Sequence, residues 1–160
     1  MEVLQKIRRH PLYAENYKKL ESAEENREFC RHQMPHLLDV ARIAYIRNLE
    51  GNMGLKKEVI YAAALLHDIG KFSQYDKGIP HEKAGREIGE MILNDVDMFS
   101  PEEKEAILEA ILEHRRFAPN MTKLGRLLYE SDKLSRACYA CPAEAQCNWS
   151  SEKKNAEIEY

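Results

Sequence analysis

The sequence of 160 residues has no apolar run close to the roughly 20 residues that a membrane-crossing helix needs. No stretch alternates polar and apolar residues as a half-buried β-strand does, and there are only seven Gly and six Pro. Positive charge is not in excess, because 24 Lys and Arg stand against 27 Asp and Glu, a formal net charge of −3. These absences argue against a membrane protein, a β-rich fold and binding of a nucleic-acid polymer through bulk positive charge.

The first residues, Met1 to Pro11, lack the continuous apolar stretch of a secretory signal. We therefore expect a cytoplasmic protein whose four cysteines stay reduced and form no disulfide framework. Hydrophobic residues make up 44% of the chain and charged residues 32%, which is enough for one core under a charged surface. The length is typical of a single domain.

Apolar residues recur at helical spacing along most of the chain. The pattern predicts helices at about 12–30, 36–50, 56–68, 81–93, 101–115 and 122–138. Ser100, Pro101 and Glu103 form a strong helix start, with a capping Ser, a Pro at the first position and a Glu three residues after the cap. Gly78 and Pro80 predict a loop over 71–80, and the charged tail 150–160 is either a surface helix or loosely held. The predicted fold class is all-α, a single-domain helical bundle.

In four predicted helices, a His or an Asp occupies the position at which helical spacing would place the next apolar, core-facing residue. These residues are His36, His67 (followed at once by Asp68), His114 and Asp132. A buried carboxylate without a partner costs several kcal/mol, and a buried His still needs hydrogen bonds. Structural hydrogen-bonded pairs are one explanation. Convergence of all four in one small bundle favours a divalent cation held between facing helices.

The segment His67-Asp68-Ile69-Gly70-Lys71, preceded by Ala62 to Leu66, resembles the signature of the HD superfamily of metal-dependent phosphohydrolases. The segment His36 to Ala41 upstream and Asp132 on the last helix complete the array. The resemblance implies the helical bundle of that family, with His36, His67, Asp68 and Asp132 as metal ligands. It divides the chain into a helical extension at 1–29, the HD core at 30–137 and a cysteine-containing segment with a charged tail at 138–160.

His81 and His114 stand at the stations where two-metal members of the superfamily complete a second site. The resemblance therefore favours two divalent cations, drawn from Fe, Mn, Mg, Co, Ni and Zn, with Asp68 bridging them. In the alternative interpretation, His81 begins its helix as an exposed residue. His114 then only caps the end of its own helix, where a cationic side chain suits the helix dipole.

The resemblance implies hydrolysis of a phosphoester or phosphoanhydride bond by metal-activated water, with Asp68 and Lys71 as catalytic residues. The segment Asn120 to Asp132, with Arg136 four residues later, is similar to bacterial HD hydrolases that cleave diadenosine tetraphosphate symmetrically. This similarity implies a small phosphorylated substrate, either a nucleotide or a dinucleoside polyphosphate. No nucleic-acid polymer or membrane is expected as a partner, and a homo-oligomer is compatible with the sequence.

Basic residues near the predicted ligands are candidates for binding the substrate phosphates: Lys71, Arg115 and Arg136, with Arg116 and Lys133 extending the same basic rim. Each of them is otherwise an ordinary solvated charge. His32 lies one helical turn before His36 and is predicted to be exposed. Asp39 is predicted to be a surface charge.

Two other functions are compatible with the same predicted ligands. Some proteins with the HD fold use a di-iron pair for oxygen-dependent cleavage of a C–C or C–P bond, and His and carboxylate ligands suit iron well. The second alternative is a non-catalytic nucleotide-binding or sensory domain. The complete ligand set argues against it: His36, His67, Asp68, His81, His114 and Asp132.

Three of the four cysteines crowd a short segment beyond the region of resemblance: Cys138, Cys141 and Cys147. In one interpretation they bind a metal or an iron–sulfur cluster, with Cys30 or an outside group as a further ligand. The favoured interpretation is that the thiols are small apolar packers that secure the C-terminal segment with Pro142 and Trp149.

Overall fold

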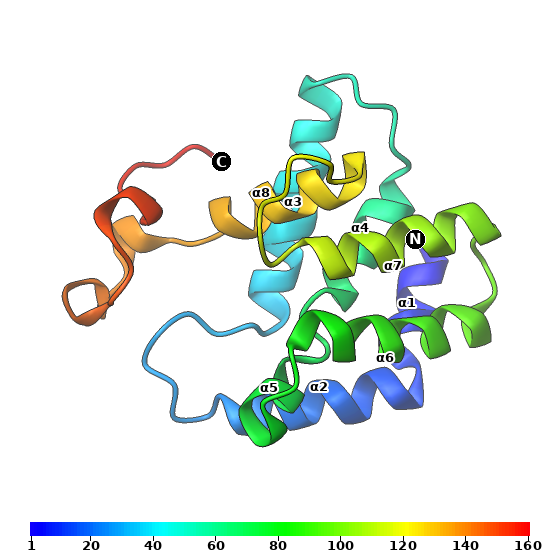
Figure 1. The fold of residues 1–160 in the computed structure, drawn as a ribbon, viewed down its shortest axis with the longest axis horizontal. Coiled ribbons are helices and arrows are strands. Elements are labelled where there is room, and N and C mark those ends of the chain that lie inside the picture. The colour runs from blue at the N-terminus through cyan, green and yellow to red at the C-terminus, as the bar shows by residue number, and fades with distance from the viewer.

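The computed structural model describes residues 1–160, the whole chain, and consists of helices without any β-strand (Figure 1). The α-helices are α1 (Glu2–Arg9), α2 (Pro11–Ala23), α3 (Met34–Glu50), α4 (Lys57–Leu66), α5 (Lys71–Lys77), α6 (His81–Val96), α7 (Pro101–Glu113) and α8 (Lys123–Leu134). Three one-turn 3₁₀ helices follow, at Cys138–Ala140, Glu144–Gln146 and Ser151–Lys153. The all-α prediction is confirmed. No helix combines the length and the apolar content that a bilayer crossing requires.

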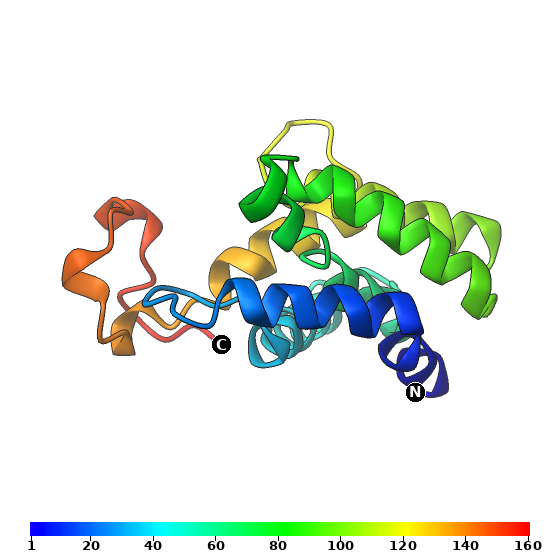
Figure 2. The same cartoon turned by 90° about the horizontal axis from the view of Figure 1, so that it is seen from below.

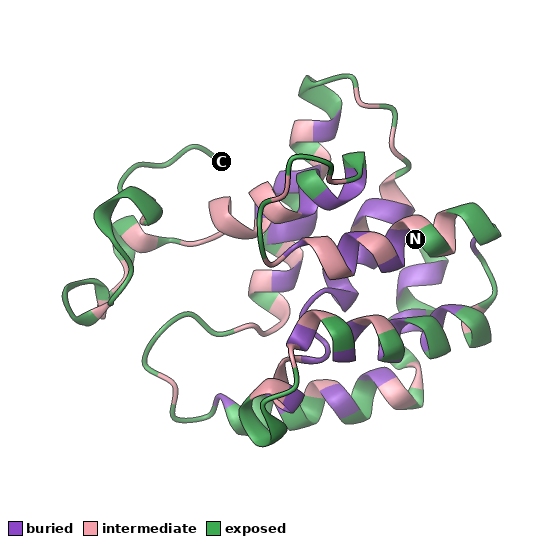
Figure 3. Cartoon of the chain, in the orientation of Figure 1, coloured by how far each residue is buried: buried purple, intermediate pink, exposed green.

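Helix α4 is the centre of the bundle. It packs against α3, α7 and α1, while α8 packs against both α3 and α7, and α6 against α7. Seven of the ten residues of α4 are buried, including three consecutive alanines whose small side chains let neighbouring helices approach closely. The buried surfaces of the other helices face this centre (Figure 3). The His67–Asp68 pair follows α4 directly and is therefore held inside the bundle.

The predicted helices that become α3, α4, α6, α7 and α8 are confirmed, with ends shifted by a few residues. The start of α7 shows the predicted capping box. The Ser100 hydroxyl accepts from the Glu103 N–H at 3.3 Å, and the Glu103 carboxylate accepts from the Ser100 N–H at 3.0 Å. Two N–H groups that the helix leaves without internal partners are thereby satisfied.

Two predictions are wrong, the helix over 12–30 and the loop over 71–80, and one helix near the N-terminus was missed. Helix α1 was not predicted, because its eight residues give only two turns of pattern among many charges; its Val3, Leu4 and Ile7 are buried. The predicted helix over 12–30 ends at Ala23, and an irregular loop continues to α3 (Figure 2). The predicted loop over 71–80 is mostly α5, because its Gly marks the end of one helix and its Pro the start of the next.

Gly70 permits a close approach between the turn after α4 and the first turns of α6. A Cβ at this position would lie 2.4 Å from the Gly85 backbone nitrogen and 2.6 Å from the His81 carbonyl oxygen. Its φ of −87° suits any residue, so the requirement for glycine here is steric. The contact brings the first residue of α6, His81, next to the His–Asp pair.

We expect Gly70→Ala to lower the free energy of unfolding by about 3 kcal/mol, because α6 must move away from the turn. The measurement is urea unfolding of the metal-free protein. Gly78→Ala is the matched control: its Cβ would meet nothing within 4 Å, and only its φ of +68° is unfavourable, at a cost of about 1 kcal/mol. Equal losses in the two variants would contradict a steric role for Gly70.

Candidate metal centre

Six polar side chains from five separate helices or helix ends meet inside one end of the bundle. Four of them are almost fully buried, with exposed fractions between 0% and 4%. The six are His36 on α3, His67 and Asp68 after α4, His81 at the start of α6, His114 after α7 and Asp132 on α8. The structure therefore brings together every residue that the sequence predicts as a metal ligand. Their role as ligands stays a prediction.

The Asp68 carboxylate lies between two groups of histidines. Its Oδ2 is 3.2 Å from His67 Nε2 and 3.5 Å from His36 Nε2. Its Oδ1 is 3.4 Å from His81 Nε2 and 3.6 Å from His114 Nε2. Each oxygen of one carboxylate thus faces a different pair of rings. This arrangement matches a carboxylate that bridges two cations.

Asp132 joins the first of these groups. Its Oδ1 is 3.4 Å from His36 Nε2 and 3.9 Å from His67 Nε2. One ligand atom from each of these three residues lies within 4.8 Å of the other two, a spacing that could hold an ion. A second set with the same property consists of His67, Asp68 and His114. His67 belongs to both sets and lies between them.

The helix ends orient the two most deeply placed rings. His67 Nδ1 donates to the Ala64 carbonyl at 2.7 Å, and His114 Nδ1 donates to the Ile111 carbonyl at 2.6 Å. Both carbonyls lie in the last turn of a helix, where no N–H within the helix is available to them. Each bond places the proton on Nδ1 and aims Nε2 at the centre. The position of each His directly after its helix is therefore what turns it inward.

The other two rings are oriented in the same way by side chains. His81 Nδ1 donates to Gln74 Oε1 at 2.6 Å. The Ser135 hydroxyl donates to the Asp132 carbonyl, so it accepts from His36 Nδ1 at 3.2 Å. All four rings therefore present Nε2 to the interior, and a metal-binding histidine is normally held through its second nitrogen like this.

The interior is short of hydrogen-bond donors. Burial and the positive charge of Lys71 lower the pKa of His81 to about 2, and burial lowers the pKa of His114. Both rings are therefore neutral, yet their Nε2 lone pairs are only 3.0 Å apart. The buried Oδ1 of Asp68 has no hydrogen-bond partner. Lone pairs that face each other beside an unpartnered carboxylate oxygen fit a divalent cation.

Both carboxylates are ionised and suited to binding a cation. Burial would raise the pKa of Asp68, but the charges of His67 and Lys71 hold it well below its usual range. Burial would likewise raise the pKa of Asp132, but Lys133 and His67 lower it. Burial would lower the pKa of His67, yet the charge of Asp68 raises it. A proton on His67 therefore offsets the negative charge of the neighbouring carboxylates. A bound cation would neutralise the same charge in place of this proton.

The structure excludes the alternative interpretation of two histidines. His81 does begin α6, but it is 4% exposed and faces Asp68, so the expectation of an exposed helix start is wrong. His114 ends α7, but its ring is buried in the centre rather than placed at the surface. His32, predicted to be exposed, is also largely covered, with 15% of its side chain accessible. Asp39 is half exposed, as predicted.

Glu24 is a buried polar residue that the sequence did not reveal. Its carboxylate is fully inaccessible and accepts three hydrogen bonds: from His32 Nδ1 at 2.5 Å, from the His32 N–H at 2.7 Å and from the Tyr75 hydroxyl at 2.8 Å. The His32 ring contacts His36 edge-on, with ring centres 5.5 Å apart. Glu24 therefore supports the wall behind a predicted ligand. One Glu in a charged stretch gives no sequence signal of this role.

A cavity of about 820 Å³ opens above the six residues, and all the predicted substrate-binding residues line it. Lys71 Nζ lies 3.7 Å from Asp68 Oδ1 and is largely covered. Arg115 is paired with Glu82 at 3.1 Å, and the Arg136 guanidinium lies over the Trp149 ring at 4.1 Å. Arg115 would have to give up its ion pair with Glu82 before its guanidinium group could contact a ligand.

An all-helical bundle that gathers buried His and Asp residues around one point has an arrangement that could hold a metal ion. The family model of the HD domain matches residues 34–137, and the chain belongs to this family. The matched region begins at α3 and includes all six residues of the centre. The prediction of an HD fold is thereby confirmed.

Three known proteins illustrate the similarity. An uncharacterized protein of Clostridium beijerinckii is 47% identical over 137 residues, which cover 86% of this chain and 85% of that protein. Ribonuclease Y of Oleidesulfovibrio alaskensis is 27% identical over 128 residues, which are 80% of this chain but 22% of that protein. A crystal structure of a predicted HD superfamily hydrolase from an uncultured Thermotogales bacterium has a TM-score of 0.64 at 20% identity, covering 96% and 87% of the two chains. This structural similarity shows the fold.

Replacing Glu24 by Gln removes the charge that holds His32 and Tyr75. Burial would raise the pKa of Glu24, but the hydrogen bond and the charge of His32 lower it below its ordinary value of 4.5. We expect Glu24→Gln to lower the free energy of unfolding by about 3 kcal/mol at neutral pH. Because the pKa of the folded state is lowered, this advantage of the wild type is full above pH 4.5 and shrinks below it. Urea unfolding at several pH values measures it.

The control for this prediction is Tyr75→Phe, which removes one donor and leaves the Glu24–His32 pair in place. It should cost about 1 kcal/mol at neutral pH. A Glu24→Gln loss that persists unchanged at pH 3 would contradict the assignment of the stabilisation to the ionised carboxylate.

Proposed function

We propose that the protein is a metal-dependent phosphohydrolase that cleaves a phosphoester or phosphoanhydride bond of a small nucleotide or dinucleoside polyphosphate. The observation that carries the proposal is the position of Asp68, whose two oxygens face separate pairs of inward-turned histidines. Family membership supports the general chemistry, because a structural neighbour of the chain is described as a predicted HD superfamily hydrolase.

Two groups of residues would hold the cations. His36, His67 and Asp132 form the first group, and His81 and His114 the second, with Asp68 shared between them. Divalent cations held there supply a hydroxide nucleophile near neutral pH and neutralise charge on the phosphorus oxygens. The burial of the residues at the floor of the cavity would strengthen these electrostatic effects.

Lys71 is placed to assist the reacting phosphoryl group. It follows the His–Asp pair at the first position of α5, and its ammonium group lies at the floor of the cavity beside Asp68. A covered ammonium group at this point stabilises negative charge that develops on phosphorus oxygens and on the leaving group. Asp68 directs the ammonium group toward the site of reaction.

The cavity suits a small anionic substrate. Its volume of about 820 Å³ lies in the range of ordinary ligand pockets, on the order of 300–1,000 Å³. Seven Lys and Arg residues line it against four Asp and Glu residues, although the whole chain carries a net charge of −3. This local excess of positive charge supports recognition of a polyphosphate.

The first test is a phosphate-release screen over mononucleotides, dinucleoside polyphosphates and a short RNA, each with added Mn²⁺, Fe²⁺, Co²⁺, Ni²⁺, Zn²⁺ or Mg²⁺. The RNA is included because Ribonuclease Y is among the similar proteins. We expect turnover of a small nucleotide that a chelator abolishes and that does not need dioxygen. Dependence on dioxygen, or cleavage of RNA alone, would contradict the proposal.

His67→Ala and Asp68→Asn should each reduce turnover by at least about 100-fold, together with the amount of bound metal, because each removes a ligand and leaves a buried partner unpaired. Asp95→Asn is the matched control, since the Asp95 side chain is 70% exposed and lies away from the cavity. It should keep full activity. The measurements are kcat and metal content after dialysis, and full activity of either ligand variant would refute the assignment.

Lys71→Met and Arg136→Gln should separate chemistry from binding. We expect Lys71→Met to lower kcat about 100-fold with the metal content unchanged, because its charge acts in the transition state. Arg136→Gln should mainly raise KM, about tenfold, because it loses one charge-assisted contact with a phosphate. Lys77→Met, at the exposed end of α5, is the control. A pure KM effect at Lys71 would contradict its catalytic role.

A further inference from the structure

The C-terminal segment, residues 137–160, has no hydrophobic core of its own. None of its residues is buried, its only regular structure is three single turns, and Trp149 is 45% exposed (Figure 3). It stands apart from the helical bundle in both ribbon views (Figures 1 and 2). The expectation that its cysteines are apolar packers therefore disagrees with the structure.

Several polar contacts connect this segment to the bundle. The Asn155 side chain donates to the carbonyls of Lys133, Leu134 and Arg136, and Arg136 lies over the Trp149 ring. The Asn155 hydrogen bonds are part-buried, and a hydrogen bond of this kind contributes only about 1 kcal/mol of net free energy. A folded segment of this size without a core normally depends on a disulfide or a metal site.

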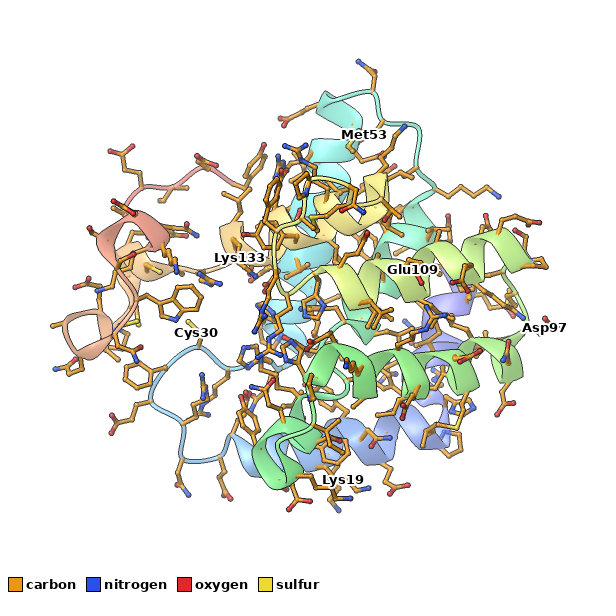
Figure 4. The ribbon with its side chains drawn as sticks, viewed as in Figure 1. Lys19, Cys30, Met53, Asp97, Glu109 and Lys133 are labelled. Carbon is orange, nitrogen blue, oxygen red and sulfur yellow. The ribbon has the colours of Figure 1, made fainter.

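All four cysteines of the chain gather at this segment, and none forms a disulfide. Cys30 comes from the loop between α2 and α3, which passes close to the segment (Figure 4). Cys30, Cys138 and Cys141 line the same end of the cavity. Burial raises the pKa of Cys30, and the neighbouring thiols of Cys138 and Cys141 raise it further.

The fourth thiol lies in the same neighbourhood. The turns Cys138–Ala140 and Glu144–Gln146 contact each other, and Cys147 directly follows the second turn. Cys138 and Cys141 share one turn, in which the Cys141 N–H donates to the Cys138 carbonyl at 3.2 Å. Cys147 ends the second turn, where its N–H donates to the Glu144 carbonyl at 3.1 Å. Residues far apart in sequence thus supply four thiols to one place.

We propose that Cys30, Cys138, Cys141 and Cys147 bind an iron–sulfur cluster of the 4Fe–4S type, which fastens the C-terminal segment to the loop between α2 and α3. Four cysteine thiolates are the usual ligands of such a cluster. Each thiol releases its proton on binding iron.

The spacing of the sulfurs argues against a preformed site for a single zinc ion. No three of the four sulfurs lie within 4.8 Å of one another. A tetrahedral zinc site with Zn–S bonds of about 2.3 Å would bring its sulfurs to about 3.8 Å. In a 4Fe–4S cluster each cysteine binds a different iron, so the sulfurs stay farther apart.

The surrounding charges suit a group with four thiolates. Arg136 lowers the pKa of Cys30, and Arg27 Nε donates to the Cys30 carbonyl at 2.7 Å. Lys153 lies near Trp149, 5.5 Å from its ring centre. Nearby cations stabilise thiolates and offset the net negative charge that four of them bring.

The cysteine site and the His/Asp centre share one cavity. Its wall runs from five of the six residues of the centre, past Arg136, to Trp149 and three of the cysteines, Cys30, Cys138 and Cys141. A cluster here would therefore hold one wall of the substrate entrance in place. The inference rests on the cysteines alone and does not depend on the proposed phosphohydrolase activity.

The test is purification of the full chain without oxygen, followed by reconstitution with Fe³⁺, sulfide and dithiothreitol, where the dithiol reduces half of the iron to Fe²⁺. We expect about four acid-labile sulfides per chain and broad visible absorption that dithionite bleaches. His67→Ala is the control for the other centre: it should lose metal from the His/Asp site and keep the full sulfide content.

The triple variant Cys138→Ser/Cys141→Ser/Cys147→Ser should lose the sulfide and the visible absorption and keep the metal of the His/Asp centre. Cys30→Ser alone should lose most of the cluster and make trypsin cleavage after Arg136 faster, with the helical circular dichroism unchanged. Absence of sulfide from the reconstituted wild type would overturn the proposal. One zinc per chain that disappears in the triple variant would overturn it as well, in favour of a zinc site.

Discussion

The buried carboxylate of Asp68 is the group on which the rest of the site depends. It is 2% exposed, one of its oxygens has no hydrogen-bond partner, and the rings nearest that oxygen are neutral. A fold can keep such a charge buried only if another charge compensates it. Four inward-facing histidines and the ammonium group of Lys71 surround this carboxylate and leave space for cations. Stability and function are therefore coupled at this one side chain.

The orientation of the histidines follows from ordinary helix geometry. An α-helix leaves its last carbonyls without internal donors, and His67 and His114 each occupy the position that donates to one of them. The same hydrogen bond fixes the orientation of the imidazole ring and gives a partner to a carbonyl group at the helix end. Alanines in α4 and the missing Cβ of Gly70 then allow α3 and α6 to approach, so that rings from separate helices meet. The histidine rings of the site are therefore positioned without any unusual backbone conformation.

The chain combines the HD centre with a segment of different character. Up to α8 it is a packed bundle, and from residue 137 onward no residue is buried. Both parts line one cavity, whose positive charges contrast with the net negative charge of the whole chain. The buried His and Asp residues form the floor of this cavity, and exposed polar residues form its rim. Under the proposed function, the floor would set the chemistry and the rim would recognise the substrate.

The sequence by itself determined the helical class, the core helices and five residues of the centre, because helical spacing and a missing apolar residue are local signals. His81, the sixth residue, was predicted only from the resemblance to the HD superfamily. The capping box was likewise predictable from only four residues, Ser100 to Glu103. Only the tertiary structure decided that α5 follows the His–Asp pair, that Glu24 is buried under His32, and that Cys30 lies beside Cys138. These features depend on contacts between distant segments, in which burial and neighbouring charge, rather than residue type, set the role of a side chain.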